Sequence, residues 1–97
     1  MMNIRKSAKG QDCQVRVPRV CNHNPETVVL AHLGGAGMGR KQHDIHGAYC
    51  CSACHDAIDG RRRTPFHRAS LKLMHLEGMV RTQRLLLEQG LIEVAQS

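Results

Sequence analysis

Aromatic residues are nearly absent from this chain, which has one Tyr, one Phe and no Trp among its 97 residues. Because each large ring usually buries about 150–250 Å², the chain lacks a common source of core stability, and small domains often use a metal or disulfides instead. Also absent are an apolar run of membrane-helix length and a signal-peptide pattern near the N-terminus. We therefore expect a cytoplasmic protein with no membrane partner, whose thiols stay reduced.

Acidic residues are in the minority, since 14 Lys and Arg face 8 Asp and Glu and give a formal net charge of +6. This charge suits a polyanionic partner, with nucleic acid as the first candidate. A solvated basic surface that keeps the protein soluble is the alternative. The length favours a single domain that spans residues 1–97.

Two short segments have the composition of β-strands. Residues 14–17 alternate in period two, as a half-buried strand does, and residues 27–30 are rich in β-branched side chains. Pro18 and residues 22–25 interrupt the chain between them, so a pair of short strands with an irregular connection is expected. Residues 34–39 are rich in glycine and are interpreted as a connector. A phosphate-binding loop is the alternative, but its Gly-Lys-Ser/Thr ending is missing.

Two helices are expected in the second half, over residues 52–59 and about 68–90, with Gly60 and Gly90 at their ends. Apolar residues recur at helical spacing in the second helix: Leu73, Leu76, Val80 and Leu87. We interpret this stripe as core packing. Gly78 lies in the middle of the helix at a cost near 1 kcal/mol, and His75 is interpreted as a surface or hydrogen-bonded core residue.

Four of the five cysteines are candidate ligands of a structural Zn²⁺: Cys13, Cys21, Cys51 and Cys54. The last two form a C-x₂-C knuckle, and four thiolates complete a closed tetrahedral site with no open position for chemistry. A redox pair is the alternative for the knuckle, but the βαβ pattern around such pairs is missing. His23 could replace one of the four ligands. Cys50 is interpreted as a small buried hydrophobe.

Histidines and acids near the knuckle are candidates for hydrolytic chemistry: His32, Asp44, His46, His55 and Asp59. Phosphodiester hydrolysis needs a base that activates water and a cation that stabilises charge on the phosphate. His32 follows an apolar run and has the right side chain for the base. On a helix, His55 and Asp59 share one face. His55 with Asp44 or His46 could hold the cation, since mixed imidazole and carboxylate ligands suit Mg²⁺, Mn²⁺ or Zn²⁺.

The combination of Ala31-His32, Asp44 and Cys51-Ser-Ala-Cys54-His55 resembles the HNH, or ββα-metal, nuclease superfamily. More narrowly, three segments are similar to the YbcO-type nucleases of lambdoid prophages: CQVRVPRVCNHNPET (residues 13–27), VLAH (29–32) and CSACHDAID (51–59). The likeness is close over about residues 4–60 and looser in the C-terminal helix. It implies an α+β fold, a small zinc-stabilised ββα-metal domain with a β-hairpin, a short metal helix and a long C-terminal helix.

The resemblance also implies roles for individual residues. His32 becomes the general base and His55 a ligand of the catalytic ion, while Asp44 falls where related phage nucleases have an acid. His46 lies near the position of the middle Asn of HNH enzymes and is a further candidate ligand. Residue 31 is Ala, where many HNH enzymes have a metal-binding Asp or His.

The function implied is a metal-dependent DNA endonuclease with a structural Zn²⁺ and a catalytic Mg²⁺ or another divalent ion. Three consecutive arginines, Arg61, Arg62 and Arg63, are expected to contact DNA phosphates. A non-catalytic zinc-finger-like module that binds DNA or a phage or host recombination protein is the main alternative. A thiol redox protein, based on Cys50, Cys51 and Cys54, is a third.

Overall fold

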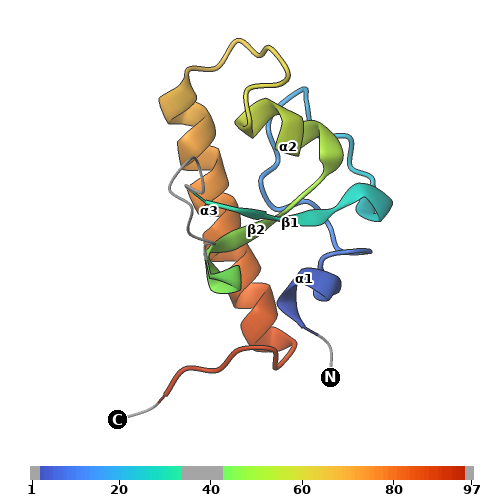
Figure 1. The fold of residues 1–97 in the computed structure, drawn as a ribbon, viewed down its shortest axis with the longest axis vertical. Helices are drawn as coiled ribbons and strands as arrows, with labels where there is room; N and C mark the ends of the chain where they lie inside the picture. Colours follow the sequence, from blue (N-terminus) through green and yellow to red (C-terminus); the bar gives the residue numbers. More distant parts are fainter. Residues whose placement is uncertain (1–2, 34–42, 96–97) are drawn as a thin grey trace.

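The computed structural model describes residues 3–33 and 43–95 of the chain. The elements follow in the order α1 (Ile4–Ser7), η1 (Pro25–Thr27), β1 (Val29–His32), η2 (Asp44–His46), β2 (Gly47–Cys50), α2 (Ser52–Ile58) and α3 (Arg68–Glu88). The hairpin of β1 and β2 crosses α3, and α2 follows directly from β2 (Figure 1). The fold is therefore a small α+β arrangement with one antiparallel hairpin and a long C-terminal helix. The glycine-rich connector of residues 34–39 lies outside the described residues.

The strand pair differs from the one expected. β1 pairs in antiparallel register with β2, so that Val29 lies opposite Cys50 and His32 opposite Gly47. Residues 14–17 are not a strand, because Arg16 adopts a φ of +55° and turns the chain there. Their alternating pattern arises because the valines on either side of Arg16 are both buried in the core. Residues 27–30 contribute only their second half to β1, since the 3-10 turn η1 extends to residue 27.

Both helices of the second half have the expected limits. α2 ends at Ile58 and is followed by Gly60 with a φ of +82°, while α3 ends at Glu88 and is followed by Gly90 with a φ of +75°. These glycines adopt the left-handed conformation that commonly ends a helix.

The buried face of α3 is not the apolar stripe, and this part of the prediction is wrong. The stripe residues are exposed: Leu73 by 56%, Leu76 by 37%, Val80 by 61% and Leu87 by 43%. The face turned to the core instead consists of Leu71, His75, Gly78, Thr82 and Leu86. This mixed set can be buried because its polar members are hydrogen-bonded within the chain.

α3 lies close against the rest of the fold at Gly78 and Thr82. A Cβ atom added at Gly78 would lie 2.9 Å from Val15 Cγ2 and 3.0 Å from Val15 Cα. The Thr82 hydroxyl accepts the backbone N–H of Tyr49 at 2.9 Å and donates to the Gly78 carbonyl at 2.7 Å. A small residue and a hydrogen-bonding residue therefore let the helix lie directly against β2 and the segment around Val15.

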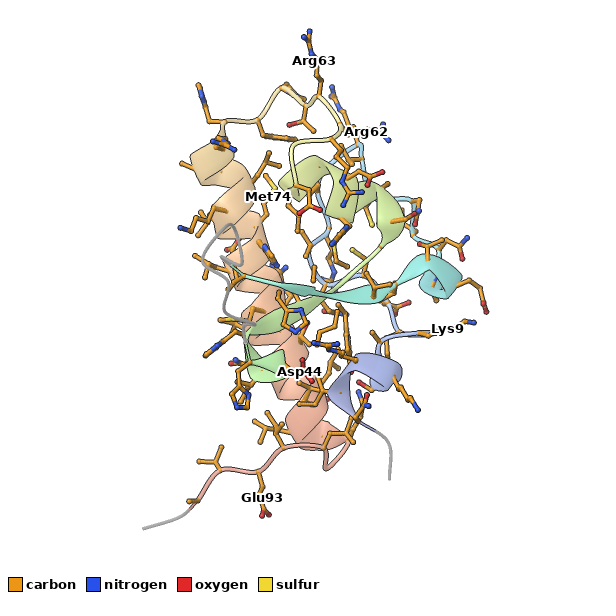
Figure 2. All side chains as sticks on the ribbon, in the orientation of Figure 1. Lys9, Asp44, Arg62, Arg63, Met74 and Glu93 are labelled. Carbon is orange, nitrogen blue, oxygen red and sulfur yellow. The ribbon has the colours of Figure 1, made fainter. Side chains whose placement is uncertain are left out.

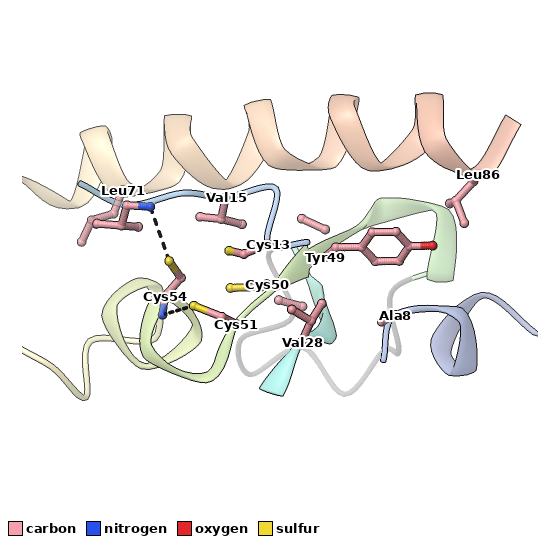
Figure 3. Close-up of a cluster of buried hydrophobic side chains, with 13 residues drawn as sticks. Ala8, Cys13, Val15, Val28, Tyr49, Cys50, Cys51, Cys54, Leu71 and Leu86 are labelled. Carbon is pink, nitrogen blue, oxygen red and sulfur yellow. Dashed lines mark hydrogen bonds between the residues drawn. The ribbon is translucent and has the colours of Figure 1, made fainter. Parts of the chain in front are cut away.

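The core is lined by small apolar side chains and sulfur atoms (Figure 3). Tyr49 is its one fully buried aromatic residue in the described part of the chain, and its hydroxyl is 2.7 Å from Ser7 Oγ. Cys50, Cys51 and Cys54 are 0% exposed and lie in the same cluster. Among the described residues, no helix has both the length and the apolar character needed to cross a membrane.

Candidate metal centre and histidine site

The four predicted zinc ligands come together in space. The sulfur atoms of Cys13, Cys21, Cys51 and Cys54 all lie within 4.8 Å of one another. A tetrahedral zinc site with Zn–S bonds of about 2.3 Å has sulfur–sulfur separations of about 3.8 Å. The sulfurs of Cys21 and Cys51 are 3.8 Å apart. This donor set fits a structural Zn²⁺ closely, although the chain places the ligands on two distant segments.

Local structure aims these sulfurs at a common point. Cys51 is the N-cap of α2, and its sulfur accepts the Cys54 backbone N–H at 3.4 Å. The Cys54 sulfur accepts the backbone N–H of Val17 at 3.4 Å. A tight turn after Val17 brings Cys21 back, since the Cys21 N–H donates to the Val17 carbonyl at 3.0 Å. Backbone N–H groups directed at sulfur also stabilise thiolate charge.

Without a cation, the thiols differ in acidity. Burial raises the pKa of Cys21 to about 11, and the hydrogen bond to Cys13 raises the pKa of Cys54. The pKa of Cys13 is lowered, because the thiols of Cys50 and Cys54 donate to its sulfur. One thiolate can thus be stabilised by its neighbours, whereas four adjacent thiolates need a positive ion.

Cys50 and His23 stand beside the cluster without joining it. Cys50 is fully buried, and its interaction with Cys13 raises its pKa, so it remains a neutral thiol as the prediction of a small buried hydrophobe requires. His23 Nδ1 lies 3.7 Å from the Cys21 sulfur. The close group nevertheless consists of four cysteines, which favours these over a set in which His23 replaces one of them.

A second site forms at the end of β1. His32 is the last residue of this strand, and its Nε2 is 2.8 Å from Oδ1 of Asp44, the first residue of η2. The side chains are 23% and 33% exposed, so the pair is accessible to a ligand. The same carboxylate oxygen accepts from Arg5 Nε at 3.1 Å, and Figure 2 shows Asp44 between the hairpin and α1. The His32 ring, followed by Arg5, lowers the pKa of Asp44.

The third group is on α2. His55 Nδ1 and Asp59 Oδ2 are 3.5 Å apart, one helical turn from each other, and both side chains are partly exposed. Asp59 also accepts from Arg61 Nη2 at 2.7 Å, so the first of the three arginines is already paired within the chain. Arg62 and Arg63 project from the loop after α2 (Figure 2).

His75 lies close to both histidine groups from the side of α3. Its Nε2–H donates to the carbonyl oxygen of Ala31 at 2.8 Å, and the residue is 7% exposed. Burial lowers the pKa of His75, with smaller contributions from the charges of His55 and His32. His75 is thus the hydrogen-bonded core residue that was expected, and the two candidate histidines both lie within electrostatic range of its ring.

The predicted ligands of the catalytic ion are not gathered like the cysteines. In residues 3–33 and 43–95, the cysteine set is the one group of three or more donors close enough to share an ion. Asp44 lies against His32, and His55 lies against Asp59. The ring of His46 stacks edge-on with that of His43, with centroids 6.4 Å apart.

Sequence reasoning missed Arg5 as a partner of Asp44. The two residues are 39 positions apart, and no spacing in the sequence connects them. The basic character of the N-terminal segment is the sole feature that could have drawn attention to it.

Comparison with known proteins gives consistent matches over nearly the whole chain. A family model described as "Putative nuclease YbcO" matches residues 2–91. Two relatives are each 52% identical to this chain, and each match covers 96% of this chain and 99% of the relative. They are "Putative nuclease YbcO" of Escherichia coli (strain K12) and "Putative nuclease ybcO" of Enterobacteria phage 82. A solved structure, described as that of a putative bacteriophage protein from E. coli K-12 MG1655, superimposes with a TM-score of 0.78 at 49% identity and covers 91% of this chain and 100% of its own. The chain therefore belongs to the YbcO family.

Proposed function

We propose that this chain is a metal-dependent endonuclease that hydrolyses phosphodiester bonds in DNA, with His32 as the general base. The observation that carries the proposal is the 2.8 Å hydrogen bond between His32 and Asp44 at a partly exposed strand end. An ionised carboxylate can only accept, so the His32 Nε2–H donates to Asp44. That bond fixes the tautomer and leaves Nδ1 free to take a proton from water. The family description as nucleases supports the same interpretation.

The order of elements around the site also supports an HNH-type arrangement. A hairpin whose first strand ends in His32 is followed directly by α2, which carries His55. The cysteine cluster holds the N-terminus of α2 to the loop before the hairpin, through Cys51 and Cys54. We therefore assign the structural zinc the role of fixing α2 relative to β1, since a closed Cys₄ site has no position for substrate.

The catalytic ion, Mg²⁺ or another divalent cation, is assigned to His55, with Asp59 as the neighbouring carboxylate. One imidazole and one carboxylate suit such an ion and leave positions for phosphate oxygen and water. When bound, the ion would stabilise negative charge on the phosphate and the leaving oxygen. Asp44 and His46 are the further ligands that the sequence predicts. The contact with His32 favours an orienting role for Asp44.

Phosphate contacts are assigned to the basic loop after α2. Arg62 and Arg63 are exposed there, whereas Arg61 already pairs with Asp59. Guanidinium groups bind phosphate oxygens in a bidentate way, which positions the backbone without reading sequence.

A non-catalytic zinc module that binds DNA or a recombination protein is the second candidate. It is favoured by the finding that the cysteines are the one close group of three or more metal donors in the described part of the chain. Such a module needs the basic surface and the zinc, but it has no use for a hydrogen-bonded His32–Asp44 pair.

Plasmid nicking in Mg²⁺ or Mn²⁺ separates the two candidates. We expect cleavage by the zinc-loaded protein and a fall of about 10²–10⁴-fold for His32→Ala, the usual contribution of a general base. The matched control is His67→Ala, since His67 is an exposed histidine at the start of α3, and this variant should cleave the plasmid normally. DNA binding without cleavage under any metal would favour the binding module. Full cleavage by His32→Ala would reject His32 as the base.

A further inference from the structure

The outer face of α3 carries an apolar stripe that no described part of the chain covers. Its four members are 37–61% exposed: Leu73, Leu76, Val80 and Leu87. At 3.6 residues per turn they fall within a narrow arc, roughly opposite the arc of the buried residues. Single exposed apolar residues are common on protein surfaces, whereas several of them on one face are typical of an interaction site.

The spacing of the stripe is that of a helix-pairing seam. Successive members are separated by three, four and seven residues, and Gln83 occupies the position that completes the 3-4 alternation. Two helices pack along such a row when apolar residues repeat every 3.5 residues on average. A second helix is therefore the form of partner that this face fits.

Three of the four stripe members are placed symmetrically about Val80 in the sequence; Leu76 is the exception, because the residue four positions after Val80 is Arg84. Leu73 lies seven residues before Val80, and Leu87 lies seven residues after it. If a second copy of α3 packs antiparallel with the two-fold axis at Val80, Leu73 of each copy meets Leu87 of the other, and the two valines meet each other. An isologous contact of this kind closes as a dimer.

The charges beside the stripe follow the same symmetry to within one residue. Glu77 and Arg84 are exposed, lie on one flank of the stripe, and form no ion pair among the described residues. They stand three residues before and four residues after Val80. In the antiparallel pair, each Glu77 lies against Arg84 of the other copy, so the contact contains two equivalent ion pairs. A parallel pair would set Glu77 against Lys72 but would leave Arg84 beside Met79, which is apolar.

We propose that the chain forms a two-fold homodimer through α3, with the helices antiparallel and the axis passing at Val80. The occupant of the stripe is a second copy of this chain, because the row of apolar residues and its flanking charges are complementary to themselves. The dimer does not depend on the proposed nuclease activity.

Sedimentation velocity of the zinc-loaded full chain tests the association. Over a range of roughly 1 μM to 1 mM, which spans moderate to weak affinities, we expect a monomer–dimer equilibrium. Val80→Glu places two carboxylates face to face on the axis and should raise the dissociation constant at least about tenfold, the equivalent of 1.4 kcal/mol. Val94→Glu is the matched control, since Val94 is 69% exposed and lies outside the stripe. A wild-type chain that stays monomeric throughout, or a Val80→Glu dimer of unchanged affinity, would overturn the proposal.

Charge reversal tests the antiparallel register and does not touch the apolar residues. Glu77→Arg alone and Arg84→Glu alone should each weaken the dimer, by roughly twofold to tenfold for two exposed pairs. A mixture of the two variants should recover it, because each mixed dimer regains both opposite-charge pairs. In a parallel dimer Glu77 would face Lys72 instead, so the mixture would show no recovery. That result would refute the register.

Discussion

Replacing Gly78 by alanine sets two effects of opposite sign against each other. In a helix interior, alanine is more favourable than glycine by about 1 kcal/mol. The added Cβ, however, would lie 2.9 Å from Val15 Cγ2, 3.0 Å from Val15 Cα and 3.1 Å from the Gln14 carbonyl oxygen. Carbon atoms prefer separations of about 3.5–4.0 Å, so α3 and the 14–15 segment would have to separate.

The structure indicates that this separation is costly. Two of the three close atoms belong to the backbone and cannot rotate away. The Gln14 backbone is held on both sides, since its N–H donates to the Tyr49 carbonyl at 2.8 Å and its carbonyl accepts from Arg81 Nη1 at 2.7 Å. Overpacking of this kind usually costs about 1–3 kcal/mol. With the helix-propensity gain of about 1 kcal/mol subtracted, we expect Gly78→Ala to destabilise the fold by about 1 kcal/mol.

Urea unfolding at a fixed free zinc concentration measures the difference, because ligand binding otherwise shifts the apparent stability. The midpoint should fall with an unchanged m-value. Lys72→Gly and Lys72→Ala provide the reference, since Lys72 is exposed on the same helix and their difference reports helix propensity alone. If Gly78→Ala gains as much stability as glycine-to-alanine does at residue 72, the close packing of α3 on the 14–15 segment is refuted.

Three further predictions concern the metal, pH and DNA. Cys51→Ser should lose the bound zinc and unfold, because structural zinc contributes on the order of 10 kcal/mol to folding. Elemental analysis should find one zinc ion in the control variant Cys50→Ala, and a zinc-loaded Cys51→Ser protein would contradict the Cys₄ assignment. Burial lowers the pKa of His75, so the stability owed to its neutral ring is complete above the unfolded value of about 6.5 and falls as the pH drops toward the lower folded value. His75→Gln retains a donor for the Ala31 carbonyl and should lessen this acid-side loss, and an identical pH profile for both proteins would be evidence against a buried neutral ring. The double variant Arg62→Ala/Arg63→Ala should bind duplex DNA more weakly, and the slope of log Kobs against log salt concentration should become shallower by about 0.9 for each phosphate that is no longer neutralised. Lys72→Ala is the single-charge control on α3, and an equal effect of that variant would indicate that net charge alone decides DNA binding.

The cluster of four cysteines and the helix limits could be predicted because their determinants are local. A C-x₂-C pair on a helix start can hold one ion wherever the chain places it, and Gly60 and Gly90 stop their helices through their own backbone conformation. The assignment of Cys13 and Cys21 as the other two ligands also followed, because a closed site needs four ligands and the C-x₂-C pair supplies two.

The strand pairing was not predictable in the same way. Residues 14–17 and 47–50 both supply side chains to the core, but only the latter hydrogen-bond along β1. An alternation of apolar and polar residues indicates which side chains are buried, but side chains are buried in this way both in strands and in turns such as the one at Arg16. The Arg5–Asp44 contact was equally hidden, because a pair 39 residues apart depends on tertiary structure alone.

The stripe on α3 shows a different limit of the periodicity argument. A 3.6-residue pattern says that one face of a helix will be shielded from water, but it does not say whether the shield comes from the same chain. Here the core side of the helix is specified by fit and by hydrogen bonds, with Gly78 admitting Val15 and Thr82 bonding to β2. Leu71 and Leu86 share that side, and the four residues of the apolar stripe lie on the opposite face. A helix that packs on its own chain through a glycine, a histidine and a threonine beside two leucines, and keeps a further row of apolar residues exposed, has a surface that a second helix can cover.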